Sequence, residues 1–311
     1  MFKRKVTGAV LVCAASFMSV SVFAASKAEQ ELADYLSSVG VQDRVTWERV
    51  EGDSLADATI YGITYLSDKG SEDKKYLIKK MTFDNYEVGN DGVSVSVKYQ
   101  GITDEEGVHF LLSEKLQPER HLSELGYEQL DDMEVNLNYV MQKLTGALEG
   151  GFKVKQDEVA AMSLDFKAEG VDSLIAQLIN LDIATLDPNL ILLSAMTAKI
   201  HKLDILADDD GYNQRRINFM PDHVKQVEGK YQECLQNLNE LNLNALESAC
   251  VAIRDYQLDR EGKLRVSINP AKPFAISSYV PMFMLLGSAG PDASGQLVQQ
   301  ILNEINLKVS N

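Results

Sequence analysis

The residue types that most often carry catalysis or bind metal ions are few and scattered in this sequence. The four histidines, His109, His121, His201 and His223, show neither the spacing of an HExxH zinc motif nor a neighbouring cluster of cysteines. The chain also contains no G-x-S-x-G nucleophile elbow and no phosphate-binding G-x-x-x-x-G-K-[ST] loop. The sequence therefore predicts no catalytic residue, no metal site and no cofactor.

An acidic run before Gly211 is similar to a calcium-binding loop. When Gly211 is aligned with the glycine of such a loop, Asp208 and Asp210 fall at ligand positions. The first and last ligand positions then hold Leu206 and Ile217, which cannot coordinate a cation. A polar hairpin or strand-to-helix turn is therefore favoured. Paired carboxylates for glycoside hydrolysis stay open, because their geometry is set by folding rather than by spacing.

Two cysteines, Cys234 and Cys250, are expected to form a disulfide. Cys234 lies on the apolar side of a helical pattern over Pro221–Leu238, and Cys250 shares a second apolar helical pattern with Leu246 and Ile253. A helical hairpin could bring the two sulfur atoms together. Closing a loop of this size would stabilise the fold by about 3 kcal/mol. The alternative is a pair of unlinked thiols in the core.

Residues 1–24 have the layout of a secretory signal peptide. Basic residues precede an apolar stretch, and Val22 and Ala24 place small residues before a cleavage site at Ala25. We expect cleavage, loss of Cys13 with the signal, and export to the periplasm, where a disulfide can form. An uncleaved membrane anchor is the alternative. After cleavage, no transmembrane segment is expected.

The charge of the chain limits its partners. Its formal net charge is −16, with 30 Lys and Arg against 46 Asp and Glu. Such a chain repels phosphate backbones and anionic membrane surfaces, so we expect no nucleic-acid partner. A lysine cluster over Lys74–Lys80 is interpreted as the solvated face of a strand.

Alternating apolar and polar residues predict an antiparallel sheet through much of the chain. Clear examples are Val93–Tyr99, Met133–Tyr139 and Ala161–Lys167. We therefore expect an α+β fold of antiparallel meander sheets with helices concentrated in the C-terminal half. The strand pattern lapses near residue 120, which predicts an N-terminal β-rich subdomain (25–120) and a C-terminal α+β subdomain (121–311).

The segment Lys263–Leu286, "KLRVSINPAKPFAISSYVPMFMLL", combines a half-buried strand, two prolines and a dense apolar run. The run from Phe274 to Leu286 is expected to be a helix too short to span a bilayer. It would either plug the core or dock on a ligand or partner. The candidate contact residues for docking are Phe274, Ile276, Val280, Phe283 and Met284.

Several blocks resemble a known family. They include "GDSLADATIYGITY", "YLIKKMTFDNYEVGNDGVSVSVKYQGI" and the closing "LRVSINPAKPFAISSYVPMFMLLG". The chain resembles a group of proteobacterial envelope proteins of unknown function, similar in style to the YdgA-like family, over most of its exported length. The resemblance implies an exported, sheet-rich protein and carries over no catalytic residue.

These observations predict an exported, non-catalytic protein that binds a lipid or another apolar ligand in its curved sheets. The candidate lining residues are Tyr61, Tyr65, Val95, Tyr99 and Leu137, for which the alternative is an ordinary core. A protein-interaction or scaffold module of the cell envelope is the alternative function, and an unrecognised hydrolase is a third.

Overall fold

The computed structural model describes residues 25–67, 74–117, 121–171, 197–279 and 291–311. The expected signal peptide lies outside these residues. So do Val280, Phe283 and Met284 of the apolar run after Phe274.

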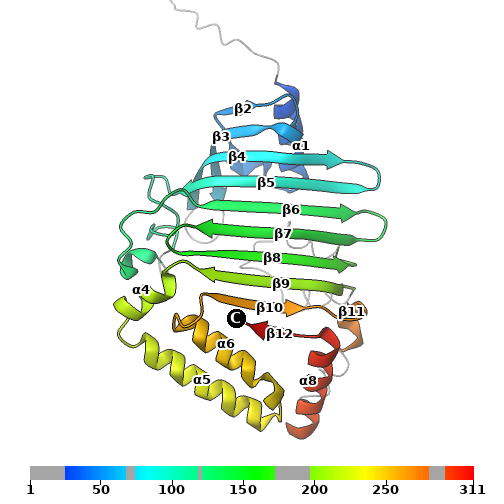
Figure 1. Ribbon diagram of the computed structural model, residues 1–311. Coiled ribbons are helices and arrows are strands. Elements are labelled where there is room, and N and C mark those ends of the chain that lie inside the picture. Colours follow the sequence, from blue (N-terminus) through cyan, green and yellow to red (C-terminus); the bar gives the residue numbers. More distant parts are fainter. Residues whose placement is uncertain (1–24, 68–73, 118–120, 172–196, 280–290) are drawn as a thin grey trace, which may run out of the picture.

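Twelve strands form one antiparallel sheet in the order β1-β3-β4-β5-β6-β7-β8-β9-β10-β12, with β2 paired to β3 and β11 paired to β9 (Figure 1). From β3 to β10 each strand pairs with the next, so the predicted meander is confirmed as one sheet rather than several. The strands are β1 (Val45–Thr46), β2 (Arg49–Glu51), β3 (Thr59–Ser67), β4 (Lys74–Val88), β5 (Gly92–Thr103), β6 (Glu134–Gln142), β7 (Ala147–Gln156), β8 (Ala160–Glu169), β9 (Lys199–Asp209), β10 (Lys263–Ile268), β11 (Phe274–Ala275) and β12 (Lys308–Ser310).

The described helices gather at the two ends of the sheet (Figure 1). Helix α1 (Lys27–Ser38) lies beside the first strands, while α4 (Tyr212–Phe219), α5 (His223–Glu240), α6 (Glu247–Gln257) and α8 (Pro291–Ile305) lie near β9, β10 and β12. A capping box starts α1: the Glu29 N–H donates to Ser26 Oγ at 3.2 Å, and the Ser26 N–H donates to Glu29 Oε2 at 2.8 Å. Sheet and helices together give the predicted α+β class.

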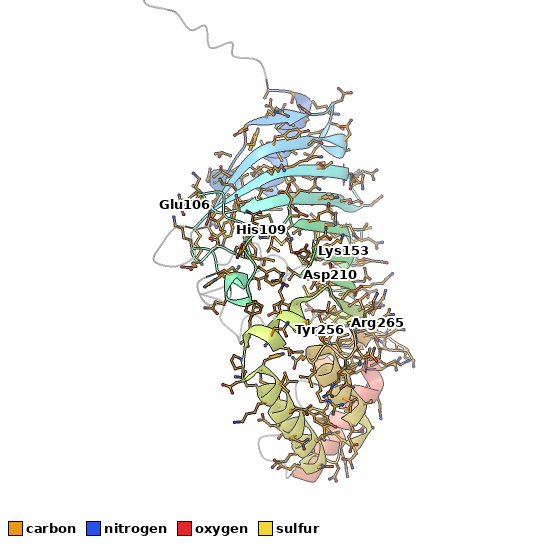
Figure 2. The ribbon with its side chains drawn as sticks, turned by 60° about the vertical axis from the view of Figure 1, so that its left-hand side comes forward. Glu106, His109, Lys153, Asp210, Tyr256 and Arg265 are labelled. Carbon is orange, nitrogen blue, oxygen red and sulfur yellow. A yellow bond between two sulfur atoms is a disulfide. The ribbon has the colours of Figure 1, made fainter. Side chains whose placement is uncertain are left out.

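Strand alternation divides the sheet into two chemically different faces. On what we call the apolar face, Val97, Leu137 and Phe152 pair in one row, which Leu164, Ile205 and Val266 continue. On the polar face the next row holds Lys98, Asn136, Lys153, Ser163, Leu206 and Arg265. Figure 2 shows Lys153 and Arg265 on the side of the sheet opposite His109.

A bend crosses β3, β4 and β5 at a single row. Gly62 and Gly101 both have positive φ, 61° and 68°, a conformation that favours glycine, and Lys79 lies between them. The inward side switches at this row, so that Ile60 and Ile63 are both buried although they are three residues apart. The Lys79 ammonium and the Asp132 carboxylate form an ion pair at 2.6 Å beside Gly101.

Two hydrophobic clusters cover parts of the apolar face. The first joins α1 to β3, β4 and β5, and its buried members are Ala28, Leu32, Tyr35, Leu36, Leu55, Ala58, Ile60, Ile63, Met81, Phe83, Val95 and Val97. The second lies under the connection between β5 and β6 and is formed by Leu122, Leu125, Tyr127 and Val159. Asp104 orders the start of that connection, because its carboxylate accepts the Ser113 hydroxyl at 2.5 Å and the N–H groups of Glu106 and Val108 at 2.9 Å.

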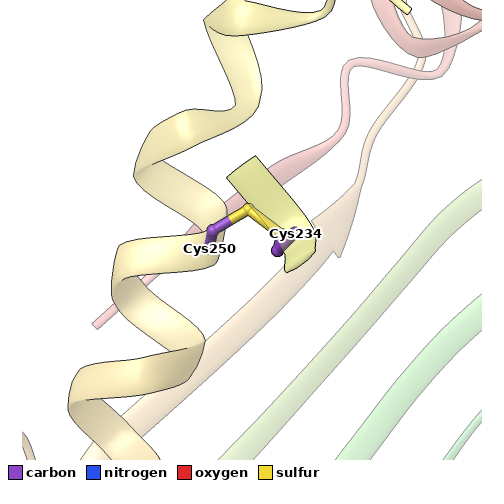
Figure 3. Close-up of a disulfide and its surroundings, with 2 residues drawn as sticks. All are labelled: Cys234 and Cys250. Atoms are coloured by element: carbon purple, nitrogen blue, oxygen red, sulfur yellow. A yellow bond between two sulfur atoms is a disulfide. The ribbon is translucent and has the colours of Figure 1, made fainter. Parts of the chain in front are cut away.

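Two sequence predictions are confirmed near the C-terminal helices. Cys234 of α5 and Cys250 of α6 form a disulfide with a Cα–Cα distance of 6.2 Å (Figure 3). The acidic run is a strand-to-helix turn between β9 and α4, in which Asp209 accepts the N–H groups of Gly211 at 3.1 Å and Asn213 at 3.0 Å.

The expected boundary at residue 120 stays a prediction. Strands β5 and β6, which flank it, pair over nine residues in the same sheet. Very short strands stand at both ends of the sheet: β1 and β2 beside β3, and the three residues of β12 beside β10. Short edge strands offer little backbone for pairing with another chain.

Candidate functional site

The apolar face is unevenly covered by the described residues. Beneath α1, Phe83 and Val97 are each 1% exposed. The same row continues through Leu137, Phe152, Leu164, Ile205 and Val266, which are all only half-buried. At about 4.8 Å between strands, the four steps from β6 to β10 span about 19 Å. We call these five residues the half-buried row.

A glycine interrupts the neighbouring row of the same face. Gly150 pairs with Tyr139 on one side and Phe166 on the other, so two aromatic residues flank a position without a side chain. A Cβ atom at Gly150 would lie 2.4 Å from the Asn138 carbonyl oxygen and 3.0 Å from Tyr139 Cβ. No larger residue fits there without a shift of the neighbouring backbone.

Tyrosines collect at the α1 end of this face. The Tyr35 ring centroid lies 5.7 Å from that of Tyr86. Burial raises the pKa of Tyr99 to about 12, with a smaller contribution from Tyr139. The pKa of Tyr139 is also raised, first by burial and then by Tyr86. These hydroxyls therefore stay protonated at neutral pH and can donate hydrogen bonds.

The structure separates the five lining residues expected from the sequence. Tyr99 and Leu137 are half-buried on the apolar face, whereas Val95 belongs to the core at 2% exposure. Tyr61 points to the other face, where the Arg49 guanidinium lies 4.0 Å from its ring centroid. Tyr65 lies past the bend, with its ring 5.9 Å from that of Tyr76.

The expected helix beginning at Phe274 is wrong at its start. Phe274 and Ala275 are extended as β11, because their backbone pairs with Ile200 and Lys199 of β9. Phe274 is buried and stacks on Tyr279, with ring centroids 4.9 Å apart. Ile276 opens a short 3-10 turn, Ile276–Ser278. The docking role of Phe274, Ile276, Val280, Phe283 and Met284 stays a prediction.

Several titratable groups in the described part of the chain contact local partners rather than one another in a shared site. There, no group of three or more His, Cys, Asp or Glu residues could hold a metal ion. His109 Nδ1 accepts the Leu111 N–H at 3.2 Å, and His223 Nε2 lies 3.1 Å from the Gln257 carbonyl oxygen. Asp165 and Asp204 face each other across β8 and β9, but Arg265 is paired with Asp204 and lowers its pKa.

The polar face carries an open hollow over β6, β7 and β8. Its volume is about 750 Å³, and its lining includes Asn138, Gln142 and Thr145. It also includes the ion pair between Lys167 and Glu149, at 2.8 Å. No described helix crosses this side of β4–β9, which faces the viewer in Figure 1. The mixed charges are typical of a solvated sheet face.

No helix among the described residues combines the length and the apolar character needed to cross a membrane. Neither a protein-family model nor a curated protein matches this chain. The resemblance to the YdgA-like family therefore stays a prediction, and the function has to be argued from the apolar face.

Proposed function

We propose that this protein is an exported, non-catalytic protein that binds an apolar ligand along the apolar face of its sheet. The observation that carries the proposal is the half-buried row of Leu137, Phe152, Leu164, Ile205 and Val266, next to the fully buried Phe83 and Val97. Export is supported by the Cys234–Cys250 disulfide, which fits an oxidising compartment such as the periplasm.

A single acyl chain suits this surface. The row spans about 19 Å, slightly more than half of a bilayer's hydrocarbon core of about 30 Å. Each buried methylene contributes about 0.8 kcal/mol, so lengthening an alkyl chain by two carbons should tighten binding about 15-fold until the row is filled.

The test combines extraction with a matched pair of variants. Native mass spectrometry of protein purified from the periplasm should detect a co-purifying lipid. Fatty alcohols of increasing length should then compete with a fluorescent apolar probe. Affinity that does not change with chain length would contradict the proposal.

Neighbouring residues on opposite faces provide the control. Phe152→Ala removes a ring from the half-buried row and should weaken binding of a long fatty alcohol about tenfold. Lys153→Ala changes the next residue, which is exposed on the polar face, and should leave the affinity unchanged. Equal effects of the two substitutions would place the ligand elsewhere.

A further inference from the structure

Four tyrosines from four different elements pack in or against the first hydrophobic cluster, where the apolar face passes under α1. Tyr35 comes from α1, Tyr86 from β4, Tyr99 from β5 and Tyr139 from β6. Tyr86 and Tyr139 flank Val95 in register, and the Tyr35 ring packs edge-on against Tyr86. Resting on the proposed function, we infer that this tyrosine cluster binds the polar head of the ligand and that the head is an uncharged hydrogen-bond acceptor.

Tyr86, Tyr99 and Tyr139 all pack against the first hydrophobic cluster, of which Tyr35 is a buried member. Tyr99, Tyr139 and Tyr86 each add to the effect of burial in raising the pKa of Tyr35. No hydrogen bond between described residues uses the hydroxyl of Tyr99 or Tyr139. A hydroxyl that makes no hydrogen bond within the protein is free to donate to an acceptor atom supplied by a ligand.

The charges around the tyrosine cluster favour an uncharged polar head group over an anionic one. In β5–β10, the side chains of the apolar face defined above are aliphatic or aromatic, and the lysines and Arg265 of the same strands alternate onto the polar face. Two acidic residues of α1, Asp34 and Glu31, raise the pKa of the Tyr86 hydroxyl, after burial. A carboxylate or phosphate head would be repelled and would find no cation, whereas an ester or hydroxyl oxygen can accept from the tyrosines.

The geometry also orients the ligand. The tyrosine cluster lies on β4–β6, and the half-buried row runs from β6 to β10. A head held by Tyr99 and Tyr139 therefore leaves the alkyl chain over Phe152, Leu164 and Ile205.

The experiment compares three amphiphiles with the same alkyl length: monolaurin, laurate and dodecyltrimethylammonium. Each competes with the neutral probe N-phenyl-1-naphthylamine, below its micelle concentration and at roughly 0.3 M salt, where long-range repulsion is screened. Monolaurin should bind at least about tenfold more tightly than laurate, and the ammonium, which has no acceptor atom, should also bind more weakly than monolaurin.

Variants separate the tyrosines from general burial. The double variant Tyr99→Phe/Tyr139→Phe keeps the rings and should weaken monolaurin binding about tenfold while leaving the probe affinity unchanged. Tyr61→Phe, on the other face beneath Arg49, is the matched control and should change neither.

The possible failures are distinguishable. Tight laurate binding, or unchanged monolaurin affinity in the double variant, overturns the inference but leaves an apolar site in place. If neither the neutral probe nor any amphiphile binds, the apolar face is already filled by the chain itself, and the proposed function fails together with the inference.

Discussion

Replacing one leucine of the first hydrophobic cluster and one of the half-buried row distinguishes a ligand surface from a closed core. Leu32 of α1 is 0% exposed within the first hydrophobic cluster, whereas Leu164 of β8 is half-buried. Leu32→Ala should lower the free energy of unfolding by about 3–5 kcal/mol, because the packed site keeps a cavity. Leu164→Ala should cost less, about 1–2 kcal/mol, because part of its side chain is already exposed to solvent and no closed cavity forms.

Urea unfolding of the purified, ligand-free protein measures both values. Circular dichroism follows the sheet. The fluorescence of Trp47, the only tryptophan, follows the cluster under α1. Coincidence of the two transitions justifies a two-state treatment.

Added fatty alcohol should sharpen the contrast. A saturating apolar ligand stabilises the wild-type protein by about 2.7 kcal/mol at one hundred times its dissociation constant. Leu164→Ala should reduce this gain, while Leu32→Ala should leave it intact. If Leu164→Ala costs as much as Leu32→Ala and ligand has no effect, the face is packed core and the reasoning is wrong.

The remaining predictions concern the helices at the C-terminal end. Replacing Cys234 and Cys250 together by serine should lower the free energy of unfolding by about 3 kcal/mol, because the bridge closes a loop with a sequence separation of 16; equal urea midpoints with and without the bridge would contradict this. Burial, with Arg216 and Lys230 nearby, lowers the pKa of His223. The unfolded chain therefore takes up a proton first, and stability should fall as the pH drops through about 6.5. Thermal unfolding across this range should show a weaker pH dependence in His223→Gln, and an unchanged slope would refute the assignment.

The local pattern of apolar and polar residues predicted most helices and strands, because it reflects which side chains are buried and which face solvent. Val93–Tyr99 alternates cleanly and forms part of β5, and the cysteine helices follow their three- and four-residue spacing. Alternation also predicted one wet and one apolar face. It could not show that the strands join in one sheet, because pairing depends on contacts between distant residues.

The sequence misled where backbone geometry overrides alternation. Tyr61 and Tyr65 have the same parity and were expected on one face, yet the positive φ of Gly62 puts them on opposite faces. Phe274 and Ala275 read as helical because they are apolar, but pairing with β9 extends them. The tyrosine cluster was found only in part, through Tyr99, because Tyr35, Tyr86 and Tyr139 meet it from other elements.

An antiparallel sheet with one wet face needs its other face covered, since exposed apolar area costs free energy. Among the described residues, α1 provides this cover over β3–β5, and the second hydrophobic cluster provides it around Val159 at the end of β7. Neither buries the row from Leu137 to Val266 as deeply as Phe83 is buried. Burying the apolar area that this row still exposes would release free energy, and this is the driving force available for binding an apolar ligand. The difference between the destabilisation caused by Leu32→Ala and by Leu164→Ala therefore measures how much of the apolar surface on that row is not buried by the folded chain itself.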